Sequence, residues 1–197
     1  MSLLDDRHEE WSKVVTLVEA INHSDAAAFE SAFVEVANAW LLEPAMKACA
    51  RLQSVSPDIR TSFLKFWLTH GDTMRSQVAS DLILIGGLRT LLPPYQGEPV
   101  QLFRGETAGN RQRRTYGMSW SAQRSVAESY ASVRADRNDG GMVVLGTFAP
   151  TEAIISAPGL IVPGINEGEY IVDRRKLGEI LVLARVKHSA EFTAPDT

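Results

Sequence analysis

Apolar residues in the first half of the chain recur at the spacing of an α-helix. One stripe begins after Ser24, a candidate N-cap, and comprises Phe29, Phe33, Val36, Ala37, Trp40 and Leu41. Ser56 as a cap with Pro57 at the first helical position indicates a second helix start. A run from Asp72 to Leu88 predicts a further helix, and the front segment predicts one through Trp11, Val15, Val18 and Ile21. We therefore expect a helical region over residues 1–95.

After residue 95 the pattern changes from helical to mostly β. Eleven of the 14 glycines fall there, and the segments that alternate or run apolar as strands do are 99–103, 141–149, 169–173 and 179–186. Residues 122–133 predict one helix, with Val126, Tyr130 and Val133 on its buried side. The turn-rich segment 93–99 is the candidate boundary. The pattern thus predicts an α+β protein, with a helical region over residues 1–95 followed by a β-sheet region over residues 96–197.

Composition and charge narrow the class of protein. The chain has 197 residues, 45% of them hydrophobic and 22% charged, which is ordinary for a globular protein. Its net charge of −4 argues against a general nucleic-acid binder. The single cysteine, Cys49, excludes an intramolecular disulfide, and its helical surroundings favour a buried residue over a nucleophile.

Targeting signals and metal motifs are not evident in the sequence. The start, "MSLLDDRHEEW", lacks the order of a secretory signal, and no apolar run approaches the roughly 18 residues of a spanning helix. We expect a cytoplasmic protein without a membrane partner, with delivery by a signal-independent route left open. The histidines are scattered and neither phosphate-binding glycine motif occurs, so no metal and no dinucleotide-fold site is expected. The basic run 110–114 is interpreted as a solvated loop, or as a contact for a pyrophosphate or an acidic partner.

Arg104 and Gly105, in "LFRGE", form the first of three clusters with chemical potential. An arginine at the end of a strand offers a planar fork of donors that suits phosphate or carboxylate. A glycine beside it lets a ligand approach the backbone. A solvated surface arginine is the alternative interpretation.

Ser119 and Ser121, in "YGMSWSAQRSVAESYA", form the second cluster and share one face if residues 117–121 are extended. Ser121 is predicted to be the N-cap of the following helix. Ser119 has no such role, and its hydroxyl can orient a neighbouring carboxylate. Trp120, on the other face, is expected in the core.

Glu167 and Glu169, in "GINEGEYIVD", form the third cluster and enter a strand on the same side, about 6 to 7 Å apart. Like charges this close repel unless solvent or a cationic ligand lies between them. A carboxylate suits reactions with an oxocarbenium-like state, and a second one can take a proton from the incoming nucleophile. A charged turn with a solvated carboxylate is the alternative.

In this order, the three clusters resemble the mono-ADP-ribosyltransferase superfamily and, more narrowly, its Arg-Ser-Glu branch of bacterial toxins, phage enzymes and vertebrate ecto-enzymes. The resemblance covers residues 98–187, and the Ser-Trp-Ser run is similar to that of uncharacterised bacterial and phage members. It implies an ADP-ribosyltransferase-like mixed β-sheet core and an enzyme that transfers ADP-ribose from NAD to a protein side chain, releasing nicotinamide.

The resemblance also implies individual roles. Residues expected to bind NAD, which is the substrate, are Arg104, Gly105, Ser119, Ser121 and Glu169. Arg104 would hold the phosphate and ribose region, and the Gly105 backbone would bond the nicotinamide carboxamide. Ser119 would position Glu169, which would grip the nicotinamide ribose and stabilise the oxocarbenium ion. Glu167 would orient or deprotonate the acceptor, which is often arginine in members with Glu-x-Glu.

Three other functions stay open from the sequence. An NAD glycohydrolase would share the first chemical step and use water as its acceptor. A catalytically inactive interaction module would keep the fold without the reaction, and a glycosidase would use the two carboxylates alone. The expected partners are NAD and an unidentified protein acceptor, and the helical region is a candidate contact for a neutralising or regulatory partner.

Overall fold

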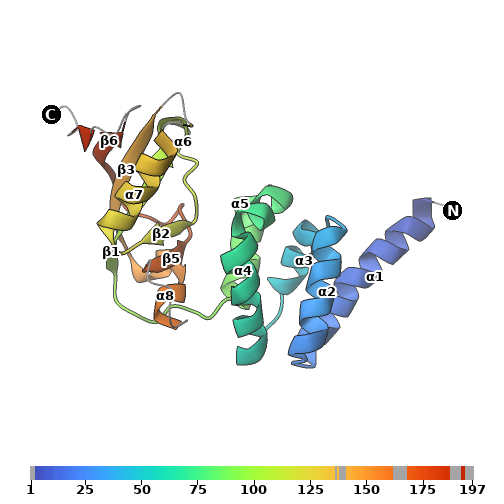
Figure 1. Ribbon diagram of the computed structural model, residues 1–197. Coiled ribbons are helices and arrows are strands. Elements are labelled where there is room, and N and C mark those ends of the chain that lie inside the picture. The colour runs from blue at the N-terminus through green and yellow to red at the C-terminus, as the bar shows by residue number, and fades with distance from the viewer. Residues whose placement is uncertain (1–2, 136, 138–140, 162–167, 187–191, 194–197) are drawn as a thin grey trace. The chain divides into compact units, whose positions relative to one another are not determined.

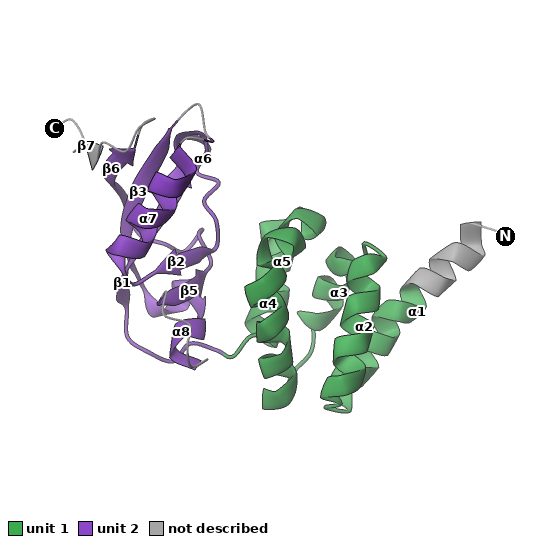
Figure 2. Cartoon of the chain, viewed as in Figure 1, with its two compact units in different colours: residues 1–93 green, residues 94–197 purple. Residues whose placement is uncertain are grey.

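The computed structural model describes all residues except 1–2, 136, 138–140, 162–167, 187–191 and 194–197. The chain divides into two compact units, residues 1–93 and 94–197 (Figures 1 and 2). The predicted α+β class is confirmed: helices dominate the first unit, and an antiparallel sheet organises the second. The division falls two residues before the boundary expected from the sequence.

The first unit is built from helices around a core of aromatic and aliphatic side chains. Its helices are α1 (Leu3–Asn22), α2 (Ala26–Asn38), α3 (Leu42–Cys49), α4 (Pro57–Val78) and α5 (Asp81–Leu91). Phe33 of α2 contacts Phe63 and Phe66 of α4, with ring centroids 5.5 and 5.0 Å apart. Cys49 is fully buried, and this burial raises the pKa of its thiol to about 12 despite an opposing backbone hydrogen bond. The thiol is therefore protonated at neutral pH and is a poor nucleophile.

The helix ends of this unit confirm one prediction and correct two. Ser56 accepts a hydrogen bond from the Ile59 N–H and caps α4, as expected. The cap of α2 is Asp25, not Ser24, because the Asp25 carboxylate accepts from the Ala28 N–H at 3.0 Å. The predicted helix start at Asp72 is wrong, since α4 continues unbroken to Val78. No helix among the described residues combines the length and apolar composition that crossing a membrane requires.

The second unit is organised by one sheet. Its strands are β1 (Val100–Thr107), β2 (Ser119–Ser121), β3 (Met142–Ala149), β4 (Ile154–Ser156), β5 (Glu169–Val172), β6 (Ile180–Val186) and β7 (Phe192–Thr193). Within the described part of the chain, these seven strands pair antiparallel in the order β4-β5-β2-β1-β3-β6-β7. The four predicted strands correspond to β1, β3, β5 and β6, and β1 extends four residues beyond its predicted end.

One face of the sheet carries a large apolar core. Trp120 of β2 is paired directly with Tyr170 of β5, and both pack in a cluster with Leu102 of β1. Trp120 is 2% exposed, and its indole N–H donates to the Gly117 carbonyl at 3.1 Å. The expectation that Trp120 belongs to the core is therefore confirmed.

The opposite face of β1 and β3 is covered by α7 (Arg124–Ala135), as Figure 1 shows. The side of α7 in contact with the sheet consists of alanines, namely Ala127, Ala131 and Ala135. The predicted buried side is wrong, because Tyr130 is 38% and Val133 70% exposed. Small residues face the sheet because helix and strand backbones approach closely there. Short helices α6 (Ala108–Arg113) and α8 (Pro158–Ile161) and a 3₁₀ turn (Thr151–Ala153) complete the described part of this unit.

Candidate active site

Three neighbouring strands bring together the segments singled out in the sequence. Arg104 and Gly105 lie within β1, Ser119 and Ser121 form the two ends of β2, and Glu169 is the first residue of β5. Strand β2 lies between the other two in the sheet. Segments that are distant in the sequence therefore share one region of the second unit (Figure 1).

The strand register decides which serine lies next to Glu169. Ser121 is paired directly with Glu169 on one side and with Phe103 on the other. Directly paired residues on an antiparallel ladder share a face, with Cβ atoms about 4.5 to 5.5 Å apart. Ser119 is paired with Ile171 and is therefore a diagonal neighbour of Glu169. Of the two serines, Ser121 is the closer to the partly buried Glu169 in the register.

Ser121 also shapes the turn that leads into α7. Its side chain is buried, and its hydroxyl oxygen accepts a hydrogen bond from the Gln123 N–H at 2.9 Å. The helix begins at Arg124, so Ser121 lies before the N-cap position. The prediction that Ser121 is the N-cap itself is therefore wrong. The contact closes a serine turn, which competes with regular structure and lets the chain change direction after β2. The Ala122 N–H donates to the Gly168 carbonyl at 2.9 Å, which fixes the turn beside Glu169.

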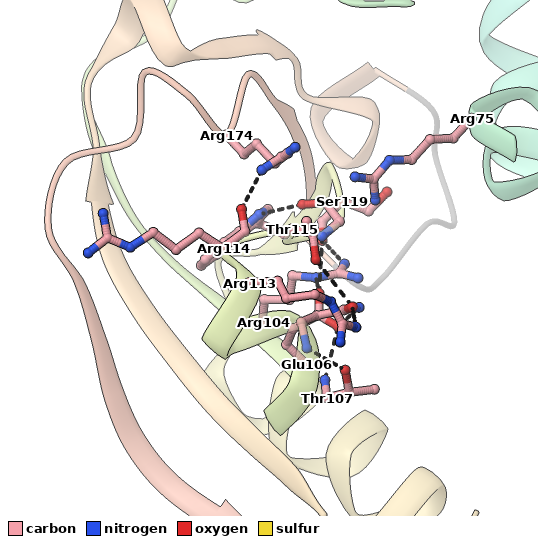
Figure 3. A network of polar contacts seen from close by, with 12 residues as sticks. Arg75, Arg104, Glu106, Thr107, Arg113, Arg114, Thr115, Ser119 and Arg174 are labelled. Carbon is pink, nitrogen blue, oxygen red and sulfur yellow. Dashed lines mark hydrogen bonds and ion pairs between the residues drawn. The ribbon is translucent and has the colours of Figure 1, made fainter. Parts of the chain in front are cut away.

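Arg104 is held by a polar network at the end of β1 (Figure 3). Its Nε donates to Glu106 Oε2 at 2.9 Å, and its Nη1 donates to the Ser119 carbonyl at 2.5 Å. The arginine side chain is 19% and the glutamate side chain 5% exposed. This arginine is thus an internal tie between β1 and the start of β2, and the surface-arginine alternative does not describe it.

Glu106 is the residue in the framework of the site that sequence reasoning missed. Its carboxylate accepts hydrogen bonds from Arg104, from the Thr107 and Gly117 N–H groups, and from the Asn110 amide. Burial raises the pKa of this carboxyl, but the charge of Arg104 and these hydrogen bonds outweigh it and leave the pKa below its usual value. The sequence did contain a signal for this contact. Arg104 and Glu106 carry opposite charges and are two residues apart on a strand, so their side chains leave the strand on the same side.

Strand alternation separates Arg104 from the serine and glutamate side chains. Arg104 leaves β1 on the same face as Leu102, which belongs to the Trp120 core. Ser121 and Glu169 share the face of Phe103, which packs with α7. The structure therefore brings Ser121 and Glu169 together on one face and directs the Arg104 side chain from the other.

Two glycines are required by close approaches at this site. A Cβ on Gly105 would lie 2.6 Å from the Ala127 carbonyl oxygen of α7, so this glycine lets the helix contact β1. A Cβ on Gly117 would lie 2.1 Å from Arg104 Nη2, so this glycine makes room for the guanidinium. The close packing of α7 on β1 is a sufficient reason for a glycine at position 105, so the approach of a ligand is not needed to explain it.

Glu167, the basic run 110–114 and a metal site are the remaining features considered in the sequence. Glu167 lies outside the described residues. The basic run 110–114 is not a loop: its first four residues belong to α6, and Arg114 ends that helix with a φ of 54°. Among the residues that the structure describes, no group of three or more histidine, cysteine, aspartate or glutamate side chains is placed to hold a metal ion.

Comparison with protein-family models, with curated proteins and with solved structures found no match for this chain.

Proposed function

We propose that the protein is an NAD-dependent mono-ADP-ribosyltransferase that transfers ADP-ribose to a protein side chain, with arginine as the first acceptor to test. The observation that carries the proposal is the direct pairing of Ser121 with Glu169, on a strand that also borders the Arg104 strand. Residues from separate segments that the sequence singled out are neighbours in one sheet. This arrangement supports the order of motifs that the sequence shares with the Arg-Ser-Glu branch.

In the proposed reaction, the bond between the nicotinamide nitrogen and C1′ of the ribose breaks. The electron pair leaves with nicotinamide, and positive charge develops on C1′ and the ring oxygen. The carboxylate of Glu169 stabilises this charge because it is already in place and partly shielded from water. The acceptor nitrogen then forms the new bond to C1′ and loses a proton, which Glu167 is proposed to take.

Ser121 and Arg104 support this chemistry in different ways. The Ser121 hydroxyl, directly across the ladder, is proposed to fix the orientation of the Glu169 carboxylate. Arg104 is proposed to act mainly as a positioning residue, because its guanidinium joins Glu106 to the Ser119 carbonyl. This role replaces the direct phosphate clamp that the resemblance implies.

Nicotinamide release from NAD by the purified full chain tests the proposal, with Glu169→Gln as the decisive variant. This substitution keeps the shape and removes the charge, so we expect release to fall by about two orders of magnitude or more while the circular dichroism spectrum is unchanged. Glu98→Gln, at an exposed position of the same unit, is the matched control and should keep full release.

A folded Glu169→Gln protein with near-normal release would overturn the mechanism. Absence of release by the wild-type chain, with or without an arginine-rich acceptor protein, would favour an inactive interaction module. Rapid release without labelling of any acceptor would instead identify an NAD glycohydrolase. Intact-mass measurement of the acceptor detects the mass of ADP-ribose and separates these cases.

A further inference from the structure

A basic pocket lies in the second unit, apart from the strands that carry Ser121 and Glu169. It has a volume of about 520 Å³. Its described lining residues are Arg111, Arg114, Tyr116, Arg174, Arg175, Leu177, Gly178, Glu179 and Ile180. They come from α6 with the residues that follow it, and from the turn between β5 and β6 with the first residue of β6. Two separate segments thus contribute two arginines each.

The charge of this pocket is unbalanced. Among its described lining residues, four are arginines and one, Glu179, is acidic. Arg175 is compensated by Asp173 through two hydrogen bonds, at 2.9 and 3.0 Å. Counting that pair as neutral and setting Glu179 against one guanidinium still leaves a net positive charge, to which Arg111 and Arg114 contribute. Guanidinium groups collected from two segments repel one another unless an anion lies between them.

Arg111 adds an independent sign that a ligand is missing. Its Nε is buried and has no hydrogen-bond partner among the described residues. A buried donor left unpaired costs free energy, and in native proteins such groups usually have a partner. A phosphate oxygen is the kind of acceptor that a guanidinium N–H binds most strongly.

The two segments are held in place by direct contact. Arg174 Nη1 donates to the Arg114 carbonyl, so the turn after β5 is tied to the end of α6 (Figure 3). Asp173, which is fully buried, anchors the turn further by accepting from the Arg175 N–H at 3.1 Å. The arginines are therefore presented from a fixed frame, which reduces the entropy lost on binding an anion.

The remaining wall of the pocket is apolar. Leu177 and Ile180 are partly buried, and they and Tyr116 pack in the Trp120 core. This core occupies the sheet face opposite to that of Ser121 and Glu169. The pocket is thus distinct from the proposed catalytic carboxylate, and it combines an anion-binding side with an apolar side.

We propose that this pocket binds the phosphate groups of a phosphorylated small molecule, with the non-ionic part of the ligand against Leu177 and Ile180. The proposal does not depend on ADP-ribosyl transfer. The volume of the pocket falls within the range of small-molecule sites. The arginines would contact the phosphate groups of such a ligand, and the apolar wall would contact its non-ionic part. The Arg111 Nε would donate to a phosphate oxygen.

Calorimetric titration of the full-length chain tests this proposal with inorganic pyrophosphate, ADP and adenosine as the probes. We expect pyrophosphate and ADP to bind, ADP more tightly, and adenosine to bind far more weakly than ADP. Arg111→Gln and Arg174→Gln, on separate segments, should each weaken pyrophosphate binding about tenfold or more, because each removes charge-assisted hydrogen bonds. Arg185→Gln, at an exposed position of β6 outside the pocket, is the charge-matched control and should leave affinity unchanged.

Three results would overturn the proposal. These are no binding of pyrophosphate or ADP at millimolar concentration, equal binding of ADP and adenosine, and an equal loss of affinity in Arg185→Gln, which would indicate nonspecific charge attraction. Circular dichroism of each variant establishes that it is folded, and Arg174→Gln decides the matter if Arg111→Gln does not fold. Glu169→Gln should keep its pyrophosphate affinity, so failure of the proposed catalytic function would leave this result intact.

Discussion

Glu106 and Arg104 are the two side chains that organise the end of β1. Four donors converge on the Glu106 carboxylate, and Arg104 connects that carboxylate to the Ser119 carbonyl of β2. Buried charges of this kind persist only where their hydrogen bonds are satisfied. The position of Ser119 and the course of the chain through Gly117 therefore depend on a residue that takes no part in the proposed chemistry.

Glu106→Gln should destabilise the second unit by about 2 to 4 kcal/mol. The substitution removes the charge opposite Arg104, and it replaces an acceptor oxygen with an NH₂ group facing other donors. Urea denaturation followed by circular dichroism measures the loss. Exposed Glu98→Gln is the control and should change stability by no more than about 0.5 kcal/mol. Equal stability of wild type and Glu106→Gln would contradict the role assigned to the network.

The same carboxylate gives a pH dependence with a defined sign. Because the folded state holds the pKa of Glu106 below its ordinary value of 4.5, protons bind more strongly to the unfolded chain. The stabilisation from Glu106 is therefore complete above about pH 4.5 and is lost as the pH falls through the depressed pKa. The difference in unfolding free energy between wild type and Glu106→Gln should shrink over that acidic range. A difference that stays constant below pH 4.5 would contradict the assignment.

Glu167→Gln separates bond breaking from acceptor activation. Water can attack an oxocarbenium ion with little help, whereas a guanidinium must be held and relieved of a proton. We expect this variant to keep much of its nicotinamide release in the absence of an acceptor and to lose most of the labelling of protein or of a small guanidine. Both activities are measured in one preparation. Equal survival of both would make Glu167 a solvated turn residue, and joint loss in a folded protein would assign it to the first step.

At the scale of elements, the contact between α7 and β1 positions the turn that contains Ser121. The helix presents alanines to the sheet, and Gly105 removes the last side chain between the two backbones. The larger residues of the helix are left on the outside, where Arg134 lies over the Tyr130 ring at 4.3 Å. Because the main chains of α7 and β1 pack closely, small side chains are buried between them and the larger apolar ones are exposed, which is the reverse of the usual pattern.

Gly105→Ala should therefore destabilise the protein, by about 1 to 3 kcal/mol, because the added methyl group would meet the Ala127 backbone. Gly109→Ala is the matched control, since a Cβ there would make only ordinary contact with the Arg113 side chain, at 3.5 Å. Thermal unfolding of the two variants measures the difference. If Gly105→Ala is as stable as Gly109→Ala, the helix is not in close contact with β1 at this point.

At the scale of the whole molecule, each unit has buried residues of its own. The two apolar clusters on the faces of the sheet consist entirely of residues from 94–197. The aromatic contacts of α2 and α4 belong entirely to residues 1–93. A unit that contains its own core can fold by itself.

A fragment of residues 94–197 should accordingly fold, with a β-rich circular dichroism spectrum and a cooperative thermal transition. It contains every residue assigned to the proposed reaction, so we expect it to release nicotinamide from NAD at the rate of the full chain. The full-length protein from a parallel preparation is the control. A folded fragment without release, next to an active full chain, would show that the helical unit takes part in the reaction.

The sequence by itself determined the division into helical and β halves, four of the strands and the cap at Ser56. These features depend on local physics, since residue spacing, turn residues and capping groups act within a few positions. It also singled out Arg104, Ser119, Ser121 and Glu169 as chemically suitable residues. Local pattern failed where two signals competed, as at Ser24 and Asp25. It also failed at Asp72, where the pattern predicts a helix start although α4 continues to Val78 and ends at Ala79, a residue that does not mark a helix end in the sequence.

Only the tertiary structure decided which of these residues meet. The register places Ser121, not Ser119, opposite Glu169. The two serines share a face of the sheet, so alternation along β2 alone does not distinguish them, and only the pairing with β5 does. The buried side of α7 was set by the backbone approach at Gly105, and the role of Glu106 by donors from Asn110 and Gly117. Each of these facts depends on segments far apart in the chain, and residue spacing along a single segment carries no information about such contacts.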